Sequence, residues 1–495
     1  MLNLAVILRE SAAARPDAPA VLHDGGVVTY AELDARSDAL AAGLAARGVR
    51  PGTAIALQLP NIPEFLVAYY GILKAGGVVV PMNVLLRAPE IAYQLTDSGA
   101  RALITWAGTA AEAGKAAAEA GVGEVYVVGA GTFDDLLAPV AEPLPLCERA
   151  PGDTAAVVYT SGTTGVPKGA ELTHFQLYMN ADIPGRLFEI RPDDVVIAAL
   201  PFFHVYGMSS TMNLAVRFGA ALSLVPRFTP DRVLATIERD RATVFDGVPT
   251  MFGALLASAR TTDYDTSSLR VCVSGGDAIP AHVLDEFERQ FRVPILEGYG
   301  MTETASTITF NRSPEDRRMY SVGKPVWGVE VEVWDDDDRR LPPGRGHIGE
   351  LVTRGYHTMR RYHGHPAATA DAFRGGWFHT GDLGYADADG FFYIVDRKKE
   401  LIIRGGYNVY PREVEEVLYR HPDLIEAAVI GVPDERLGQE VKAIVVPAPG
   451  RTPAAGDIVE YCRERLAAYK YPRLVELRDE LPLTASGKVA KKELV

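Results

Sequence analysis

Hydrophobic residues in the first two thirds of the chain alternate between short continuous runs and helix-spaced positions. The run over residues 54–59 is typical of a buried strand, and after it Ile62, Phe65, Leu66 and Tyr69 recur at the spacing of one helical face. This alternation predicts βαβ units, and therefore a largely parallel sheet covered by helices. We expect further strands at residues 78–81, 101–106, 125–128, 155–159, 195–200, 221–225, 243–245 and 269–274.

The first 50 residues predict helices on either side of a turn at Arg15, Pro16 and Asp17. Thr29 stands three residues before Glu32, which is the spacing of a capping box. We therefore expect a helix to begin after Thr29.

Beyond residue 320 the hydrophobic pattern changes to a period of two. Residues 329–334 alternate apolar with acidic side chains, and residues 348–352 follow after a turn rich in Pro and Gly. This pattern predicts a short antiparallel β subdomain. The acidic run at residues 335–338 ends its first strand, and we interpret that run as a solvated turn, with a metal site as the alternative.

A charged cluster at residues 396–400 interrupts apolar runs on both sides and indicates a domain junction. Beyond the cluster, the pattern predicts a small α+β domain with helices near 411–420 and 456–468 and strands near 426–431 and 440–446. The predicted fold class is therefore α/β, with a large N-terminal domain of βαβ sheets plus a β subdomain. The predicted division is residues 1–396, a hinge at 397–400, and a C-terminal domain at 401–495.

Length, charge and cysteine content narrow the class of protein. The 495 residues exceed a single core, and the net charge of −14 argues against non-specific nucleic-acid binding. No apolar stretch approaches the roughly 20 residues of a membrane span, and the N-terminus lacks the basic region of a signal peptide. The widely spaced Cys147, Cys272 and Cys462 predict reduced thiols in a cytoplasmic protein.

The segment from Tyr159 to Gly169 is dense in Gly, Ser and Thr and follows an apolar run. Glycine allows the backbone N–H groups to approach an anion, and the hydroxyl groups and Lys168 add further donors. The segment therefore predicts a polyphosphate-binding loop, with a flexible surface loop as the alternative. It is not a Walker A loop, because Lys168 is followed by Gly169 rather than by Ser or Thr.

This segment resembles the signature of the adenylate-forming superfamily, which contains acyl- and aryl-CoA synthetases, luciferases and peptide-synthetase adenylation domains. Further stretches resemble the superfamily in the same order along nearly the whole chain. They lie at residues 201–207, 274–277, 297–303, 379–384, 396–411 and 481–488.

The resemblance implies a site for ATP and Mg²⁺. A carboxylate such as Asp382 suits ribose hydroxyls because it only accepts hydrogen bonds, and Glu303 is a hard oxygen ligand suited to Mg²⁺, with Thr160 in support. The residues implied to bind ATP or AMP are Thr160, Ser161, Gly162, Thr163, Thr164, Gly165, Lys168, Gly276, Glu297, Gly298, Tyr299, Gly300, Thr302, Asp382 and Arg397.

The resemblance also implies residues for the acid, for coenzyme A and for catalysis. Lys488, His204 and Thr302 are implied to be catalytic, and Lys399 occupies the hinge position of a mobile C-terminal domain. The implied acyl pocket contains His204, Val205, Tyr206, Met208, Gly276 and Thr304, with Ser209 and Met212 as further candidates. The implied coenzyme A face contains Gly405, Gly406 and Tyr407.

The expected function is ATP-dependent activation of a medium- or long-chain fatty acid to an acyl-adenylate, followed by transfer to coenzyme A. Three alternatives stay open: an aryl or cinnamate-type CoA ligase, an adenylating enzyme that loads an acyl carrier protein, and a non-catalytic nucleotide-binding relative. The expected partners are a small carboxylic acid, ATP, Mg²⁺ and coenzyme A, with no nucleic acid and no membrane span. A homodimer is also left open.

Overall fold

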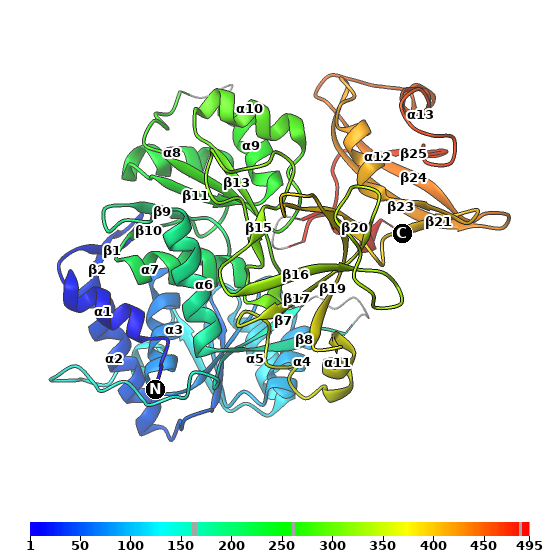
Figure 1. Cartoon of the computed structure of the whole chain (residues 1–495). Helices are drawn as coiled ribbons and strands as arrows, with labels where there is room; N and C mark the ends of the chain where they lie inside the picture. Colours follow the sequence, from blue (N-terminus) through cyan, green and yellow to red (C-terminus); the bar gives the residue numbers. More distant parts are fainter. Residues whose placement is uncertain (161–165, 260–262, 485–487, 495) are drawn as a thin grey trace.

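Two large sheets form the lower and upper parts of the N-terminal region, and a smaller sheet carries the chain to the C-terminal region (Figure 1). The computed structural model describes residues 1–160, 166–259, 263–484 and 488–494. Together with the small C-terminal sheet, this arrangement confirms the predicted α/β fold class.

The first large sheet has six strands in the order β6-β5-β3-β4-β7-β8. Its strands run parallel as far as β7, and β8 then returns antiparallel to β7. The predicted strand–helix alternation is confirmed here by β3 (Ala54–Gln58), α3 (Pro63–Lys74), β4 (Val78–Pro81), α4 (Ala88–Ser98), β5 (Ala102–Trp106), α5 (Ala110–Ala120), β6 (Glu124–Val128), β7 (Thr154–Thr160) and β8 (Lys168–Thr173).

The second large sheet has nine strands in the order β15-β14-β13-β12-β11-β9-β10-β1-β2. Its centre, from β1 to β13, is parallel. Its strands are β1 (Pro19–His23), β2 (Gly26–Thr29), β9 (Val195–Ala198), β10 (Ala221–Leu224), β11 (Val244–Gly247), β12 (Val271–Ser274), β13 (Ile295–Tyr299), β14 (Thr309–Phe310) and β15 (Lys324–Pro325).

Besides α3, α4 and α5, the N-terminal region contains helices of three kinds. Tyr206–Asn213 forms a π-helix, labelled η2, directly before α7. The 3₁₀ helices are η1 (Asp134–Leu136) and η3 (Thr302–Thr304). The α-helices are α1 (Val6–Ala14), α2 (Tyr30–Ala46), α6 (His174–Leu187), α7 (Leu214–Phe218), α8 (Pro230–Asp240), α9 (Pro249–Ala259) and α10 (Ala281–Phe291).

The prediction that the first 50 residues are helices around one turn is wrong between α1 and α2. A hairpin, β1–β2, occupies that stretch and adds an edge to the nine-stranded sheet by pairing with β10. Asp24 and Gly25 make the tight connection between the paired residues His23 and Gly26, and pairing with the sheet buries Val21. The predicted capping box is confirmed, because the Thr29 side chain accepts from the backbone N–H of Glu32 at the start of α2.

Helix α3 joins the cores of the two large sheets. Its residues from Phe65 to Lys74 are buried on all sides, whereas the sequence predicted one apolar face. Phe65 lies 5.4 Å from Phe202 between ring centroids, so α3 contacts the segment that follows β9. Both sheets contribute side chains to this one large apolar cluster. The two sheets are therefore held as one body by a shared core.

The predicted β subdomain is confirmed as a five-stranded sheet. Its strands β16 and β17 pair antiparallel over Val329–Trp334, as the period of two predicted. Its elements are β16 (Val329–Trp334), β17 (Gly349–Gly355), α11 (Pro366–Ala372), β18 (Phe373–Arg374), β19 (Trp377–Ala386) and β20 (Phe392–Arg397).

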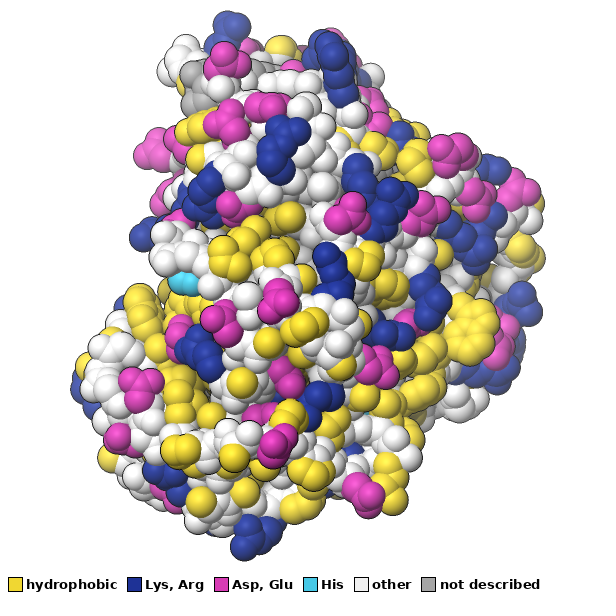
Figure 2. Space-filling view, turned by 90° about the vertical axis from the view of Figure 1, so that its left-hand side faces the viewer, with side chains coloured by type: hydrophobic (Ala, Val, Ile, Leu, Met, Phe, Trp, Pro, Cys, Tyr) yellow, Lys and Arg dark blue, Asp and Glu magenta, His cyan; other side chains and the backbone are white. Residues whose placement is uncertain are grey.

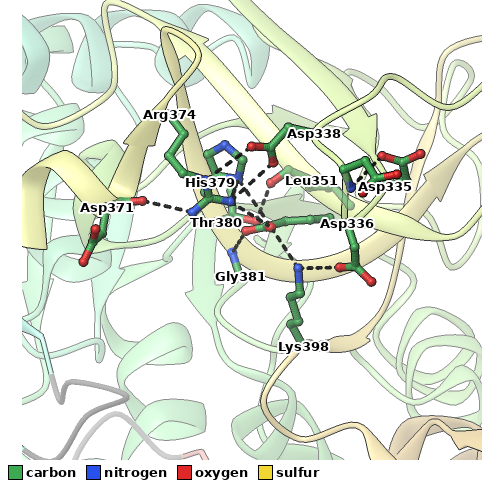
Figure 3. A network of polar contacts seen from close by, with 12 residues as sticks. Asp335, Asp336, Asp338, Leu351, Asp371, Arg374, His379, Thr380, Gly381 and Lys398 are labelled. Atoms are coloured by element: carbon green, nitrogen blue, oxygen red, sulfur yellow. Dashed lines mark hydrogen bonds and ion pairs between the residues drawn. The ribbon is translucent and has the colours of Figure 1, made fainter.

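The acidic run at residues 335–338 is a turn, as predicted (Figure 3). Asp335 accepts hydrogen bonds from the backbone N–H groups of Asp337 and Arg339, and Asp336 pairs with Lys398 at 2.8 Å. Within the described residues, no group of three or more His, Cys, Asp or Glu is arranged to hold a metal ion.

The C-terminal region forms a separate five-stranded sheet with two α-helices (Figure 1). It agrees with the predicted small α+β domain, while the exact division at residues 396–401 stays a prediction. Its elements are β21 (Ile402–Arg404), β22 (Tyr407–Val409), α12 (Pro411–Leu418), β23 (Leu424–Asp434), β24 (Gly438–Pro447), α13 (Ala455–Arg463), β25 (Leu474–Leu477) and the 3₁₀ helix η4 (Lys491–Glu493).

The surface carries both signs of charge. On the face that Figure 2 presents, acidic and basic side chains are interspersed with apolar ones, and neither sign forms a continuous stripe. In the described parts of the chain, no helix combines the length and the apolar character that crossing a bilayer requires.

Candidate active site

The C-terminal ends of β11, β12 and β13 meet the β subdomain at a shared edge, where parallel sheets commonly bind ligands. The Tyr299 hydroxyl, at the end of β13, donates to Asp382 Oδ2 at 2.5 Å. Arg397 Nε lies 3.4 Å from Asp382 Oδ1. The three residues predicted to contact adenine and ribose are therefore brought together from three separate elements.

Asp382 is buried and firmly held. Its backbone N–H donates to Thr380 Oγ1 at 3.1 Å, and the Thr380 hydroxyl donates to the carbonyl oxygen of Leu351 at 2.7 Å (Figure 3). Burial raises the pKa of Asp382, while Arg397, the Tyr299 hydroxyl and Lys488 oppose that rise. The carboxylate thus has positive neighbours that favour its charged, hydrogen-bond-accepting form.

Lys488 reaches this edge from the C-terminal region. It lies on a short hairpin closed by the Leu483–Val489 bridge, and its carbonyl accepts from the Thr484 N–H at 2.7 Å. At Gly276, which has φ +84°, an added Cβ would stand 3.2 Å from Lys488 Cε. The Lys488 side chain therefore lies directly against Gly276, and the structure brings together two predicted site residues that are far apart in sequence.

Charged groups from two strands and two connecting segments surround Lys488. Burial lowers the pKa of Lys488, and Asp277, Asp382 and Glu400 oppose this effect, whereas Arg397 adds to it. The Lys488 ammonium group lies among carboxylates, and the negative charge of a bound polyphosphate would further favour its protonated form.

His204 is neutral in this site. Burial, and then the nearby charge of Lys488, lower the pKa of His204 to about 3. The backbone N–H of Tyr206 donates to His204 Nδ1 at 3.3 Å, so the neutral ring carries its proton on Nε2. His204 can therefore donate one hydrogen bond without adding charge.

The four other residues of the predicted acyl pocket are all buried, but they do not share one environment. The Tyr206 ring lies against Gly275, where an added Cβ would be 3.1 Å away. Val205 and Met208 instead pack in the large core cluster of the two sheets. Thr304, in η3, donates its hydroxyl hydrogen to the carbonyl oxygen of Met301 at 3.1 Å.

Glu303 is paired with a residue that the sequence did not single out. The Tyr362 hydroxyl donates to Glu303 Oε1 at 2.8 Å, and Lys168 Nζ stands 5.4 Å from the centre of the Tyr362 ring. Tyr362 therefore joins two predicted ligands of the polyphosphate and its metal. No period or motif marks Tyr362, which stands among Arg360, Arg361 and His363.

The strand before the predicted phosphate-binding segment and the strand after it form a hairpin. Thr160 and Lys168 are Cα partners on the last rung of β7 and β8. Ser161, Gly162, Thr163, Thr164 and Gly165 lie outside the described residues, so their roles stay predictions.

The chemistry of Glu303 fits Mg²⁺. This ion is usually held by one or two carboxylates together with substrate phosphates, rather than by a cage of protein ligands. Glu303 supplies such a carboxylate, and burial raises its pKa while the Tyr362 hydroxyl opposes the rise. Glu303 therefore fits the predicted role in holding the ion, and the supporting role of Thr160 stays a prediction.

Other predicted nucleotide residues have packing roles that the sequence did not reveal. A Cβ at Gly298 would stand 2.1 Å from the Phe310 ring, and a Cβ at Gly300 would stand 1.7 Å from the carbonyl oxygen of Ser306. Burial raises the pKa of Glu297 to about 7, and the charge of Arg412 in α12 opposes this. Thr302 begins η3 beside Glu303 and is half-buried.

The predicted coenzyme A residues lie elsewhere in the C-terminal domain. Gly405 and Gly406 form the turn between β21 and β22 with φ +57° and +83°, and the Gly405 N–H donates to the Leu437 carbonyl at 2.8 Å. Tyr407 is 60% exposed and stacks on Tyr469 at 4.8 Å. These contacts all lie within the C-terminal domain, whereas Lys488 is the residue of that domain placed at Gly276.

Lys399, the predicted hinge residue, is exposed at the end of β20. Partial burial and the charges of Lys168 and Lys492 lower its pKa. Its neighbour Lys398 is anchored to the β subdomain, because Lys398 Nζ pairs with Asp336 at 2.8 Å and with Glu350 at 3.5 Å (Figure 3).

Two family models match the chain. The model described as AMP-binding enzyme covers residues 8–363, and the model described as AMP-binding enzyme C-terminal domain covers residues 413–488. A feruloyl-CoA synthase of an Amycolatopsis species is 39% identical, covering 97% of this chain and 96% of that protein. A long-chain-fatty-acid–CoA ligase of Bacillus subtilis is 35% identical, covering 100% of this chain and 94% of that protein.

A solved relative is similar to this chain in two states. ATP-bound MatB from Rhodopseudomonas palustris is 35% identical, with a TM-score of 0.94 and coverage of 100% of this chain and 98% of that one. Apo MatB, with the same identity and coverage, gives a TM-score of 0.82. The overall arrangement of this chain is therefore closer to the ATP-bound state of that relative.

Proposed function

The chain belongs to the AMP-binding enzyme family and is an adenylate-forming CoA ligase, and we propose how its residues divide that reaction. The enzyme uses ATP, Mg²⁺ and coenzyme A to activate a carboxylic acid. The observation that carries the residue assignment is the contact of Lys488 with Gly276, next to Asp382 and Tyr299.

In the first step, a carboxylate oxygen of the acid attacks the α-phosphorus of ATP. A P–O bond forms, and the bond to pyrophosphate breaks. Asp382 and Arg397 hold the ribose, and Tyr299 stacks on adenine. Lys488 and Thr302 stabilise charge that develops on the phosphate oxygens, since a preorganised cation lowers the barrier to such a transfer. Glu303 and Thr160 would hold Mg²⁺, and the bound ion would neutralise charge on the polyphosphate.

His204 orients the acid in this step. Its neutral ring presents Nε2–H as a donor beside Lys488. A donor without charge can position a carboxylate oxygen and still leave that oxygen nucleophilic.

In the second step, the C-terminal domain turns about Lys399 and withdraws Lys488. The face that contains Gly405, Gly406 and Tyr407 then reaches the adenylate, and the thiolate of coenzyme A attacks the acyl carbon while AMP leaves. Two observations support a rotation. The contacts described above for Gly405 and Tyr407 lie within their own domain, and this chain has a higher TM-score with ATP-bound MatB than with apo MatB. A moving domain lets one site discard polyphosphate and then admit a long thiol.

For the acid, we propose a hydrophobic carboxylic acid, with the medium- or long-chain fatty acid predicted from sequence as the first candidate. Each buried CH₂ would contribute about 0.8 kcal/mol, so chain length should alter kcat/KM clearly. An aryl or cinnamate-type acid is the second candidate. The 39% identical feruloyl-CoA synthase and the polar residues beside Tyr206 favour it. An acyl carrier protein as acceptor, a homodimer and a cytoplasmic location stay predictions.

A panel of acids tests the proposal. Purified protein would be incubated with Mg·ATP and one acid of either class, with and without coenzyme A. We expect AMP release and an acyl-CoA mass only when coenzyme A is present. A different result would identify a carrier protein as the acceptor. Pyrophosphate would then be released without a thioester to coenzyme A, and a thioester would form once a phosphopantetheinylated carrier protein is added. Absence of AMP with every acid would contradict the proposal.

A further inference from the structure

One face of the π-helix η2 is polar. Hydrogen bonds in a π-helix run from residue i to i+5, so positions four and five apart lie on the same face. Tyr206, Ser210 and Thr211 share that face, and each is bonded to a different segment. The Tyr206 hydroxyl donates to the Val273 carbonyl at 3.3 Å, and the Ser210 hydroxyl lies 2.8 Å from the Ser306 hydroxyl.

The third contact of this face involves a buried acid. The Thr211 hydroxyl donates to Asp246 Oδ2 at 2.8 Å, and Asp246 is 4% exposed. Burial raises the pKa of Asp246 to about 7, and the Thr211 hydrogen bond opposes this. No described Lys or Arg forms an ion pair with Asp246. A carboxyl group kept in the core without a cation is costly, and the catalytic roles above do not use it.

The polar face lies directly behind the nucleotide edge. Asp246 pairs in register with Val273, and Val273 precedes Gly276 by three residues, which span at most about 10 Å. Gly275, between them, lies against the Tyr206 ring. An acid whose carboxylate lies at Gly276 and His204 would therefore have its remote end on the side of Asp246.

Strain and unpaired hydroxyl groups mark the same place. Ala305 and Ser306 have φ of 53° and 105°, a region that residues with a Cβ seldom adopt. This backbone aims the Ser306 hydroxyl at Ser210. Thr307 and Ser274, which follow Ser306 and Val273 in the chain, are each 1% exposed, and their hydroxyl groups have no hydrogen-bond partner in the described structure. Buried polar groups without a partner point to a ligand that satisfies them.

We propose that Asp246 and Thr211 form the specificity-determining end of the acyl pocket and bind a hydroxyl or amino group at the end of the acid remote from its carboxylate. This inference rests on the proposed function. Asp246 supplies acceptor atoms for an O–H or N–H donor. An acid that ends in a methyl group or an unsubstituted ring would leave these acceptors desolvated and unpaired, and a site built this way discriminates strongly against such analogues.

Matched pairs of acids test the inference. The kcat/KM for AMP release would be measured with para-hydroxycinnamate against cinnamate, and with omega-hydroxydodecanoate against dodecanoate. We expect the hydroxylated member to be favoured by about tenfold or more in at least one pair. In Asp246→Leu we expect this ratio to fall to about one or to invert, while the KM for ATP stays unchanged.

Three further variants separate recognition from folding. Thr211→Val removes one hydroxyl and should lower the ratio less than Asp246→Leu. Asp246→Asn keeps an acceptor oxygen and should therefore preserve the preference for para-hydroxycinnamate and for para-aminocinnamate over cinnamate. Thr243→Val is the matched control, because Thr243 donates to the buried Asp194 at 2.7 Å outside the pocket, and its ratio should equal that of the unmodified protein.

Ratios near one in both pairs, or a preference that Asp246→Leu and Thr211→Val leave intact, would overturn the inference but not the proposed ligase. If no acid of either kind releases AMP, the proposed function itself fails.

Discussion

Lys488 illustrates how one side chain can depend on groups from several elements. It lies against Gly276, while Asp277, Asp382 and Glu400 favour its charged form and burial opposes it. Its neighbour Lys491 pairs with Glu415 at 2.8 Å and with Glu400 at 3.1 Å, which fixes the chain end to α12 and to the junction. The tail therefore holds Lys488 in place through its neighbour as well as through its own contacts.

Replacing Lys488 separates the two half-reactions. We expect Lys488→Ala to lower adenylation by about 100-fold or more, because the developing charge on the phosphate loses its cation. Thioester formation from supplied acyl-adenylate should be nearly unchanged. Pyrophosphate exchange and acyl-CoA mass measure the two steps. Lys115→Ala, on the surface of α5, is the control, and equal loss of both steps in Lys488→Ala would contradict the role.

Tyr362 positions Glu303 rather than touching the reacting atoms. In Tyr362→Phe the ring beneath Lys168 remains, but Glu303 loses its 2.8 Å hydrogen bond. We expect the Mg²⁺ concentration for half-maximal adenylation to rise by about tenfold, because a hydrogen bond to a carboxylate is worth about that factor. Titration with Mg²⁺ at saturating ATP measures it, and the KM for the acid should stay constant. An unchanged Mg²⁺ requirement would exclude this role.

At the scale of elements, the junction after β20 combines a fixed residue and a free one. Lys398 is tied to Asp336 and Glu350, and its N–H donates to the Gly381 carbonyl at 2.9 Å. Lys399 is exposed. Rotation of the C-terminal domain would therefore begin at Lys399, because the chain before it is held by the β subdomain.

Stiffening that position tests the rotation. Proline fixes φ, so Lys399→Pro should slow thioester formation by a larger factor than adenylation. Lys399→Ala keeps the backbone free and removes only the charge, so it serves as the control. Single-turnover measurements of adenylate formation and of its consumption by coenzyme A give the two rates. Equal slowing of both rates in Lys399→Pro would remove the hinge assignment.

The sequence predicts elements well where the pattern is long and fails where it is short. Most strands of both large sheets follow from apolar runs, and the period of two at Val329–Trp334 gives β16. The β1–β2 hairpin was missed although Asp24, Gly25 and Gly26 stand between two short apolar runs, which is itself a hairpin signal.

The candidate site shows the same division. The motifs predicted that Gly276, Tyr299, Asp382 and Lys488 belong to one site. They could do so because a resemblance to a family assigns all of its site residues together. Asp246 was missed because it interrupts an apolar run, where the strand was predicted to end at residue 245. The π-helix and its polar face could not be predicted, since the hydrogen-bond shift from i+4 to i+5 has no marker in composition.

At the scale of the whole molecule, the nucleotide edge is built from three regions. Tyr299 belongs to the nine-stranded sheet, Asp382 and Arg397 belong to the β subdomain, and Lys488 belongs to the C-terminal region. A ligand that contacts all three should hold the C-terminal domain in the present arrangement, which is the one closer to ATP-bound MatB.

Limited proteolysis tests this coupling in the intact protein. Arg397, Lys398 and Lys399 are exposed trypsin sites at the junction. With Mg·ATP at ten times its dissociation constant, we expect cleavage there to slow by about tenfold, because binding reduces the ligand-free fraction by that factor. Asp382→Ala should abolish the protection, whereas Lys115→Ala should keep it. Equal cleavage rates with and without nucleotide would contradict a shared ribose contact.

The order of these parts along the chain has an evolutionary consequence. The segments that we propose to face the acid all precede residue 310, and they are η2, β11 and residues 302–307. Gly405 and Lys488, in contrast, follow the junction. A chimera joined near residue 400 would therefore have the acid specificity of one parent. Its turnover and its thiol acceptor would come from the other parent. A crossover between η2 and β11 would break that inheritance, because it would separate Asp246 from Thr211.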